Sequence, residues 1–295
     1  MSLETTVLVL GGDLRQAAVA ARLAKEYFVC GWALPHAYRS PLVREAAAWQ
    51  EAIGNARMLV LPLPTSPDSK HLYMPHCIEE GEKPPLISEI IAATPKNCLV
   101  AGGRLSPAIR AILQSYGITY FDYFENERLQ QENAIPTAEG AVQILMQEIP
   151  RTIKGLSVGI TGFGRIAKAL AQLLLAMGAR VTVAARRKEA LNDAAQLGCQ
   201  VIELQSPVAL TAFSACEAIL NTVPQQIFTR EVLAALPPSV LLVDLASAPG
   251  GFDKEALTVL SRRVIFALSL PGKYAPLTAG EIIADTILEY VRGEL

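Results

Sequence analysis

The chain has 295 residues, of which 51% are hydrophobic and 18% charged, and this composition excludes an intrinsically disordered protein. Its length exceeds what one hydrophobic core usually organises, so two domains are expected. The formal net charge of −2 and the pI of about 6.0 create no field that would attract a nucleic-acid backbone. We therefore expect a folded, enzyme-sized protein that binds no nucleic acid.

The five cysteines lie mostly inside apolar runs and share no C-x-x-C spacing. This distribution predicts free, buried thiols and neither disulfides nor a metal site. The N-terminus lacks the basic region and the cleavage site that are typical of a secretory signal. Charges or prolines interrupt the apolar runs before they reach the roughly 18 residues of a membrane span. The sequence favours a cytoplasmic protein without a membrane partner.

Strand-like apolar runs alternate with helical segments in the first half of the chain. The predicted strands are residues 5–10, 27–33, 57–63, 97–101 and 117–121. A Ser-Pro pair before a helical pattern and a glycine after it predict helices over 41–53 and 107–116. This order of strand, helix and strand predicts a parallel sheet that is covered on both faces.

A charged stretch over 122–133 and a helix predicted from Thr137 to Ile149 interrupt this pattern, and we interpret them as the connection between two domains. Strands then resume at 157–161, 180–184, 218–223, 240–245 and 264–269. A capping box of Thr278 and Glu281 predicts a last helix, which is expected to pack back on the first domain.

The predicted architecture is α/β, with two Rossmann-like, doubly wound parallel-sheet domains and an interdomain cleft. We expect a substrate-binding domain over residues 1–130, completed by the C-terminal helix 278–295. An NADP-binding Rossmann domain is expected over residues 131–277.

The motif Gly162-Phe163-Gly164-Arg165-Ile166-Ala167 follows a predicted strand and opens a predicted helix. This is the G-x-G-x-x-A fingerprint in the strand, turn and helix context that dinucleotide binding requires. The first glycine permits the tight turn, and the second lets backbone amides at the helix N-terminus approach the pyrophosphate. A tight turn without a ligand is the alternative.

The end of the next strand indicates which dinucleotide binds. An NAD site usually places an acidic residue there, whereas this chain has Arg186, Arg187 and Lys188, which suit a 2′-phosphate. The prediction is NADP, and the alternative is a solvated basic helix start. Two further loops at strand ends either contact the nicotinamide ribose or form polar turns. Their candidate residues are Asn221, Thr222, Val223, Pro224, Leu245, Ala246 and Ser247.

In the first half, the segment Gly11-Gly12-Asp13-Leu14-Arg15-Gln16 ends a strand but lacks the dinucleotide fingerprint. Arg15 there suits a small anion, and Arg104 on another strand-end loop indicates a dicarboxylate. A capped turn with Asp13 as N-cap explains the segment equally well. Further candidate substrate contacts on strand-end loops are Thr65, Ser66 and Ser106.

Hydroxy-acid dehydrogenases usually need a His or Lys to accept the substrate proton. The three histidines, which we interpret as ordinary loop residues outside any motif, are His36, His71 and His76. The candidates for proton transfer are instead the carboxylates Glu139, Glu125 and Asp13. For Glu139, in the first turn of its predicted helix, favourable interaction with the helix dipole is the alternative role.

Four separated motifs cover residues 11–16 (Gly-Gly-Asp-x-Arg-Gln), 133–140 (Asn-x-Ile-Pro-Thr-x-Glu-Gly), 244–251 (Asp-Leu-Ala-Ser-x-Pro-Gly-Gly) and 270–280 (Leu-Pro-Gly-x-x-Ala-Pro-x-Thr-Ala-Gly). Together they resemble the A subunits of bacterial dipicolinate synthase from the first strand to the last helix. Lys273 and Tyr274 replace the smaller residues usual in that family, and residues 34–45 also differ from it, so the departures concern the loops expected to contact the substrate.

The resemblance implies an NADP-dependent oxidoreductase of dipicolinic acid biosynthesis during sporulation, in the cytoplasm of the mother cell. Its substrate would be a small cyclic dicarboxylate, dihydrodipicolinate or 4-hydroxy-tetrahydrodipicolinate, and its product dipicolinate (pyridine-2,6-dicarboxylate). Lys273 and Thr137 are then further candidate substrate contacts. The flavoprotein-like B subunit of dipicolinate synthase and further copies of the chain are the implied partners. Two alternatives stay open: an NADP-dependent dehydrogenase of shikimate or hydroxy-acid type, and a non-catalytic NADP-binding regulatory subunit.

Overall fold

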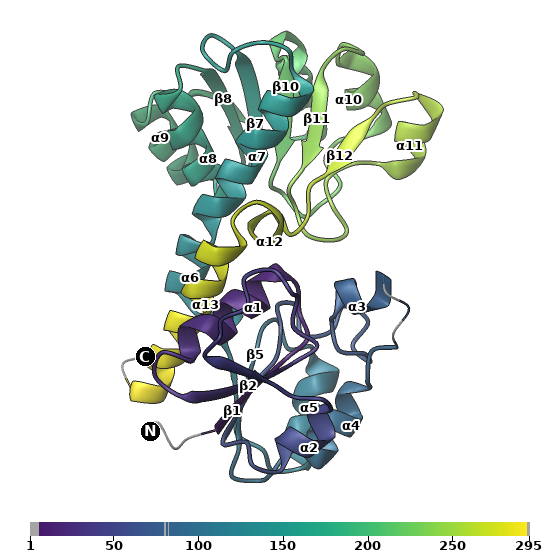
Figure 1. The fold of residues 1–295 in the computed structure, drawn as a ribbon. Helices are drawn as coiled ribbons and strands as arrows, with labels where there is room; N and C mark the ends of the chain where they lie inside the picture. Colours follow the sequence, from purple (N-terminus) through teal and green to yellow (C-terminus); the bar gives the residue numbers. More distant parts are fainter. Residues whose placement is uncertain (1–5, 80, 82, 294–295) are drawn as a thin grey trace. The chain divides into compact units, whose positions relative to one another are not determined.

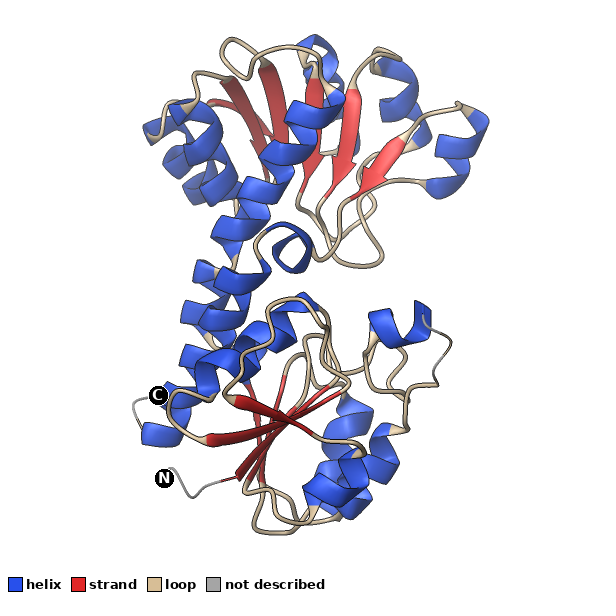
Figure 2. Ribbon diagram, in the orientation of Figure 1, coloured by secondary structure: helices blue, strands red, loops and turns tan. Residues whose placement is uncertain are grey.

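The computed structural model describes residues 6–79, 81 and 83–293. The chain divides into two compact units, which we call unit 1 (residues 1–133 and 271–295) and unit 2 (residues 134–270) (Figure 1). The boundaries between the two units lie after Asn133 and after Leu270. The sequence predicts these boundaries after residues 130 and 277. Each unit contains one parallel sheet with its own covering helices (Figure 2).

The strands of unit 1 lie side by side in the order β3-β2-β1-β4-β5-β6, and every neighbouring pair is parallel. Their bounds are β1 Thr6–Leu10, β2 Phe28–Trp32, β3 Val43–Glu45, β4 Met58–Val60, β5 Leu99–Gly102 and β6 Tyr120–Asp122. The helices are α1 Leu14–Leu23, α2 Trp49–Ile53, α3 Pro75–Glu79, α4 Ile87–Ala93, α5 Pro107–Ser115, α6 Glu127–Glu132, α12 Leu270–Tyr274, which begins at the boundary, and α13 Pro276–Arg292, with the 3₁₀ turn η1 Tyr123–Glu125.

Alternation along β1 shows why both faces of this sheet are covered. Val7 and Val9 belong to the core under α1 and α13, whereas Leu8 and Leu10 belong to the core under α2, α4 and α5. All of these side chains are fully buried. A strand that is apolar on both faces is typical of a parallel sheet with helices on each side.

The strands of unit 2 lie in the order β12-β11-β10-β7-β8-β9, again with parallel neighbours. Their bounds are β7 Ser157–Thr161, β8 Arg180–Ala185, β9 Gln200–Glu203, β10 Ala218–Asn221, β11 Leu241–Asp244 and β12 Val264–Phe266. The helices are α7 Ala134–Glu148, α8 Arg165–Ala176, α9 Lys188–Gln196, α10 Arg230–Ala235 and α11 Lys254–Val259, with the 3₁₀ segment η2 Pro207–Ala215.

Both sheets have the doubly wound strand order, in which the direction of winding reverses between the first and the fourth strand. The reversal lies between β1 and β4 in unit 1 and between β7 and β10 in unit 2. The prediction of two Rossmann-like domains is therefore confirmed. Ligands of such sheets bind at the carboxyl ends of the strands beside the reversal, so the site is sought there.

The last helix packs on the first helix of unit 1, as the sequence predicts. Ile283 and Ile287 of α13 share a core with Val19 and Leu23 of α1. The predicted capping box is wrong, because α13 begins at Pro276 and its N-cap, Ala275, makes no side-chain hydrogen bond. Proline at the first helical position suits a start there, since its missing amide would have no partner in the helix.

The helix predicted over residues 41–53 is also wrong. Val43 to Glu45 form the edge strand β3 beside β2, and only Trp49 to Ile53 are helical. Ser40 does not cap a helix: its Oγ accepts a hydrogen bond from Leu42 N at 3.2 Å within a turn. The Ser-Pro signal is correct at the second site, where Ser106 Oγ accepts from Ile109 N at the start of α5.

Three other features of the fold differ from the prediction. The helix expected from Thr137 begins at Ala134, with Pro136 inside its first turn, where a helix tolerates proline. The charged stretch over residues 122–133, interpreted as part of the connection between domains, belongs to unit 1 and forms η1 and α6. Strand β9 was not predicted, and its residues are largely exposed at the edge of the sheet.

The five cysteines are free and buried. Burial raises the pKa of Cys98 to about 12 and that of Cys216 to about 11, which makes both thiols poor nucleophiles at neutral pH. No group of side chains in the described residues could hold a metal ion. No helix in that same part of the chain is long and apolar enough to cross a membrane.

Gly280 sets the close approach of α13 to α1. A Cβ atom at this position would lie 2.5 Å from Ala18 Cβ and 2.5 Å from the backbone oxygen of Arg15. We expect Gly280→Ala to lower the free energy of unfolding of unit 1 by about 1–3 kcal/mol, because the helices must move apart. Urea denaturation followed by tryptophan fluorescence measures this, since Trp32 and Trp49 both lie in unit 1.

Gly54→Ala is the matched control. Gly54 has a φ of −60°, and a Cβ atom there would meet nothing within 4 Å. The control is expected to unfold as the unchanged protein does. Equal losses in the two variants, or no loss in either, would contradict the role assigned to Gly280.

Candidate functional site

The turn between β7 and α8 has the geometry that the dinucleotide fingerprint predicts. Gly162 has a φ of 79°, in the left-handed region that favours glycine. Its amide donates to the Ala184 carbonyl oxygen at 2.8 Å, which holds the turn against β8. A Cβ atom on Gly162 would lie 2.8 Å from Thr222 Oγ1 at the end of β10. The first glycine is therefore required by both backbone conformation and packing.

The N-terminus of α8 faces open space. Gly164 is the N-cap residue, and a Cβ atom there would meet no atom within 4 Å. The first turn of α8 contains no acidic residue. Ala167, the third small residue of the motif, is fully buried against the sheet. Amides at an unobstructed helix N-terminus bind phosphate, so these residues fit the pyrophosphate of a dinucleotide.

A buried polar network joins the strands beside this turn. Asn221 is fully buried, and its Oδ1 accepts from Thr161 Oγ1 at 2.6 Å. Its Nδ2 donates to Asp244 Oδ1 at 2.8 Å and to the Val223 carbonyl oxygen at 3.0 Å. Thr222 Oγ1 donates to the Thr161 carbonyl oxygen at 2.7 Å. Asn221 and Thr222, predicted as cofactor contacts, thus tie β7, β10 and β11 together.

The loop after β11 wraps around Asp244. The Asp244 carboxylate accepts from the amide of Ala246 at 3.1 Å and from that of Gly251 at 2.9 Å. A Cβ atom on Gly251 would lie 2.2 Å from Asn221 Nδ2, so only glycine fits. Among the remaining cofactor candidates, Leu245 and Ala246 are buried, Val223 and Ser247 are half-buried and Pro224 is exposed.

Arg186 and Arg187 lie at the carboxyl end of β8, as the sequence predicts, and both are exposed. Arg187 is the N-cap residue of α9, and Arg186 Nη2 donates to Gln225 Oε1 in the loop after β10. Glu189 lies inside the first turn of α9 rather than at the strand end. The end of β8 therefore presents two cationic side chains to solvent.

In unit 1, Arg15 is buried and engaged. Its Nε and Nη2 donate to Asp13 Oδ1 and Oδ2 at 2.9 and 2.7 Å, and Nη2 also donates to the Leu63 carbonyl oxygen. Burial alone would lower the pKa of the Arg15 guanidinium, but its hydrogen bonds to Asp13 and the charge of that carboxylate outweigh burial and raise the pKa. Asp13 also accepts from the Arg15 amide as N-cap of α1.

Side chains of α1 fill the strand reversal of unit 1. Gln16 Nε2 donates to the carbonyl oxygens of Leu10 and Val60, which are the last residues of β1 and β4. A Cβ atom on Gly272 would lie 2.7 Å from Asp13 Oδ2, so the 270–280 motif packs directly on the buried ion pair. These contacts fill the strand reversal of unit 1, which is the position where a doubly wound sheet can bind a dinucleotide.

The hydroxyl groups predicted to contact the substrate have internal partners. Thr65 is fully buried, and its Oγ1 donates to the Pro62 carbonyl oxygen and accepts from the Gly103 amide, both at 3.1 Å. Ser66 Oγ donates to Asp68 Oδ1 at 3.0 Å. Ser106 caps α5. Their hydrogen bonds stabilise the loops at the strand ends.

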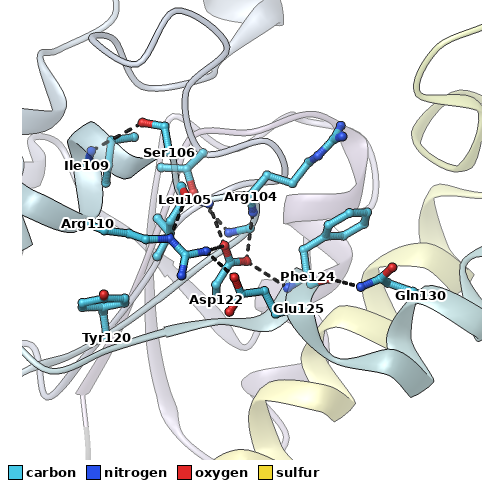
Figure 3. A network of polar contacts seen from close by, with 12 residues as sticks. Arg104, Leu105, Ser106, Ile109, Arg110, Tyr120, Asp122, Phe124, Glu125 and Gln130 are labelled. Carbon is cyan, nitrogen blue, oxygen red and sulfur yellow. Dashed lines mark hydrogen bonds and ion pairs between the residues drawn. The ribbon is translucent and has the colours of Figure 1, made fainter. Parts of the chain in front are cut away.

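Asp122 organises the loop that carries Arg104 (Figure 3). Its carboxylate accepts from the amides of Arg104 and Leu105 at 3.0 and 2.8 Å and from Arg110 Nη2 at 2.6 Å. The Arg104 side chain is exposed and points away from this cluster, with its guanidinium carbon 5.2 Å from the centroid of the Phe124 ring (Figure 3). Arg104 is therefore open to an anionic ligand.

The carboxylates predicted to be catalytic do not share one environment. Asp13 is paired with Arg15, and Glu125 accepts from Arg110 Nη2 at 2.7 Å. Glu139 is exposed on α7 of unit 2, where Thr137 on the same helix is buried. Lys273, the last substrate candidate, is exposed on α12. The structure thus assigns internal partners to two of the three carboxylates.

The structure pairs a histidine that sequence reasoning set aside. His71 Nδ1 lies 2.6 Å from Asp68 Oδ2, and both side chains are about half exposed. The imidazole and the amides of His71 and Lys70 donate to this carboxylate and lower the pKa of Asp68 well below its usual range. The Asp-x-x-His spacing after a predicted strand was the available signal.

Comparison with known proteins matches the two halves of the chain to two different families. Residues 6–124 match the family described as the N-terminal domain of the dipicolinate synthase A subunit. Residues 128–268 match the D-isomer specific 2-hydroxyacid dehydrogenase, NAD binding domain. Unit 2 is therefore a nicotinamide-dinucleotide-binding domain of the dehydrogenase type, and the chain has an oxidoreductase role.

Relatives match nearly the whole chain. The dipicolinate synthase A subunit of Bacillus subtilis (strain 168) is 26% identical over 285 residues, which cover 95% of this chain and 94% of that protein. The crystal structure of the dipicolinate synthase A subunit from Bacillus halodurans has a TM-score of 0.87 at 26% identity and covers 99% of each chain. That of the Bacillus subtilis enzyme has a TM-score of 0.82 at 24% identity, covering 100% of this chain and 97% of that one. The resemblance that the motifs indicate is confirmed.

Asp244 is expected to stabilise unit 2 rather than to bind a ligand. Asp244→Asn places an amide NH₂ against groups that donate to the carboxylate, so we expect a loss of about 1–3 kcal/mol in the free energy of unfolding of unit 2. Differential scanning calorimetry measures it. Asp253→Asn is the matched control: Asp253 caps α11 through Ala256 N, and asparagine caps a helix equally well. A thermally unchanged Asp244→Asn protein would refute this role.

Proposed function

We propose that this chain, which is related over nearly its whole length to dipicolinate synthase A subunits, is an NADP-dependent oxidoreductase that forms pyridine-2,6-dicarboxylate. The observation that carries the proposal is the combination of the two matched halves. An N-terminal half of the dipicolinate synthase type is joined to a C-terminal half whose glycine turn and open helix N-terminus fit a dinucleotide. The substrate is a cyclic, partly reduced pyridine diacid.

NADP is favoured over NAD by the charge at the end of β8. Gly162, Gly164 and the amides of α8 would hold the pyrophosphate, and Arg186 and Arg187 would pair with a 2′-phosphate. An acidic side chain that would accept from a ribose 2′-hydroxyl is absent from residues 184–188 of the strand end. When bound, the oxidised nicotinamide accepts a hydride from the substrate.

Unit 1 would bind the diacid through exposed cations at its strand ends. Arg104 is open to solvent and its loop is held by Asp122, so its guanidinium can take one carboxylate in a bidentate contact. Lys273 is the second exposed cation. The role proposed for Arg15 is indirect: paired with Asp13 and bonded to Leu63, it fixes the loop that carries Thr65 and Ser66.

The cellular setting is inferred from the same relationship. The relatives are named as A subunits of dipicolinate synthase, so its flavoprotein-like B subunit is the proposed partner, in the mother-cell cytoplasm of a sporulating bacterium. We also propose self-association of the chain. The match of unit 2 to 2-hydroxyacid dehydrogenases keeps a hydroxy-acid substrate as the second candidate.

The activity test generates the cyclic imine in situ from pyruvate and aspartate semialdehyde with its synthase. The chain and NADP are then added, with and without the B subunit, and dipicolinate and NADPH are recorded. Product from the chain alone supports the proposal, and product only in the presence of the partner assigns the chain half of a composite site. No product in either case, with turnover in a panel of hydroxy acids, would assign the second candidate function.

Arg186 is expected to discriminate between the two dinucleotides. Arg186→Ala removes a charge-assisted hydrogen bond to the 2′-phosphate, so affinity for NADP should fall about 10- to 100-fold while affinity for NAD changes little. Calorimetric titration with each dinucleotide measures the difference. Arg180→Ala, which removes an arginine bonded to Ser157 at the opposite end of β8, is the control and should change neither affinity. Equal weakening of NADP and NAD by Arg186→Ala would overturn the choice of NADP.

A further inference from the structure

We propose that His71 is the proton acceptor of the reaction and that Asp68 is the positioning residue that orients its ring. This inference rests on the proposed function. Both residues lie on the loop after β4, and Gly12 N donates to the Tyr73 carbonyl oxygen at 2.7 Å, which holds this loop at the carboxyl end of β1, beside the strand reversal. Ligands of doubly wound sheets bind at this edge.

The pair lines a cavity large enough for a substituted ring. His71 and Asp68 form part of the wall of a cavity of about 640 Å³, together with Leu72, Tyr73, Ile78 and Lys83. The wall is mostly apolar, with a few polar groups, which is the usual composition of a small-molecule site. The apolar wall suits the ring of a pyridine diacid, and Lys83 is the cation of this wall that suits one of its carboxylates.

The backbone around His71 is held on both sides. Leu72 N donates to the Pro85 carbonyl oxygen at 3.0 Å, and Ile87 N donates to that of Lys70 at 2.8 Å. His71 itself forms an antiparallel bridge with Leu86. Asp68 Oδ1 accepts from the amides of Lys70 and His71 at 2.9 and 2.8 Å. The imidazole is therefore presented from a fixed segment, which proton transfer at a defined position requires.

The contact with Asp68 selects one tautomer of the neutral imidazole. An ionised carboxylate accepts only, so Nδ1 carries the hydrogen and Nε2 carries the lone pair. The low pKa of Asp68 keeps this carboxylate ionised across the working range of pH. His71 Nε2 is thereby prepared to accept a proton, and Asp68 stabilises the imidazolium that forms.

The proton step balances with the oxidation. One ring carbon of the dihydropyridine diacid loses a hydride to the oxidised cofactor, and the neighbouring ring carbon loses a proton to His71 Nε2. The electron pair of the second C–H bond becomes the new double bond, which completes the aromatic ring. The diacid is oxidised by two electrons, the cofactor is reduced by two, and the imidazolium later returns its proton to water.

The charged and phenolic groups near the imidazole come from several segments of unit 1. Asp68 comes from the same loop, Tyr73 from the segment just after it, Lys83 from the segment before α4, and Lys70 is adjacent in the chain. Burial and the charge of Asp13 raise the pKa of Tyr73, so this phenol stays neutral. Asp68 is therefore the anion in contact with the ring.

The kinetic test compares His71→Gln with His36→Gln, a matched change at an exposed histidine of the same unit. We expect His71→Gln to lower kcat about 10²- to 10⁴-fold with little change in KM, and His36→Gln to leave both unchanged. Asp68→Asn should lower kcat less than His71→Gln does, with KM again little changed, because an asparagine amide can donate as well as accept and no longer selects the tautomer of the ring.

A second readout does not depend on turnover. In protein labelled with ¹⁵N-histidine, the ring nitrogens of His71 are expected to show a protonated Nδ1 and to shift when pyridine-2,6-dicarboxylate is added, whereas those of His36 stay in place. His71→Gln assigns the resonances, and tryptophan fluorescence from Trp32 and Trp49 shows that unit 1 of the variant is folded.

The outcomes separate this inference from the proposed function. A wild-type protein that forms no dipicolinate overturns both. Full activity of His71→Gln, loss of kcat in Glu139→Gln alone, or binding of pyridine-2,6-dicarboxylate without a shift at His71 overturns the inference and leaves the proposed function standing. Loss of kcat in His71→Gln together with the shift supports it.

Discussion

Parallel strands that end at one edge of a sheet leave unpaired backbone groups close together in the interior. In both sheets of this protein, buried polar side chains form hydrogen bonds with these backbone groups, and the loops at the strand ends depend on them. In unit 2 the buried pair of Asn221 and Asp244 joins the ends of β10 and β11 and bonds to amides of the following loops. In unit 1, Gln16 and Arg15 bond to carbonyl oxygens at the ends of β1 and β4 and just beyond. The loops beside the two strand reversals rest on these buried groups, because an unpaired polar group there would be costly.

The same topology yields two different binding edges because different residues come directly after the first strand. In unit 2 the glycine turn keeps side chains away from the start of α8, so the amides remain open to a phosphate group. In unit 1 the Asp13 and Arg15 pair occupies the start of α1, and Gly272 packs against it. The winding of a sheet therefore selects the edge, and a few residues after its first strand decide whether a dinucleotide fits there.

Sequence patterns were sufficient for most of the strands and for the helix starts whose signals are local, such as Ser106 before α5. They were insufficient where a distant partner decides. The sequence predicts an anion site at Arg15, yet its guanidinium bonds to the Leu63 carbonyl oxygen, 48 residues away. It predicts a substrate contact at Thr65, yet this hydroxyl bonds to the Gly103 amide, 38 residues away. Strand β3 is defined by its pairing with β2, which no local signal reveals.

Three of the motifs that relate this chain to dipicolinate synthase A subunits contain a glycine that packs on a buried polar side chain. Gly12 contacts Gln16, Gly272 contacts Asp13, and Gly251 contacts Asn221 beside Asp244, all at distances that exclude a Cβ atom. These motifs therefore reflect how the strand ends are packed, because a residue larger than glycine does not fit at these three positions. The groups that we propose to distinguish one reaction from another are instead exposed or half-exposed: Arg104 and His71 in unit 1 and Arg186 in unit 2. A shared motif in this fold is consequently strong evidence of common architecture, and the chemistry has to be tested at the side chains around it.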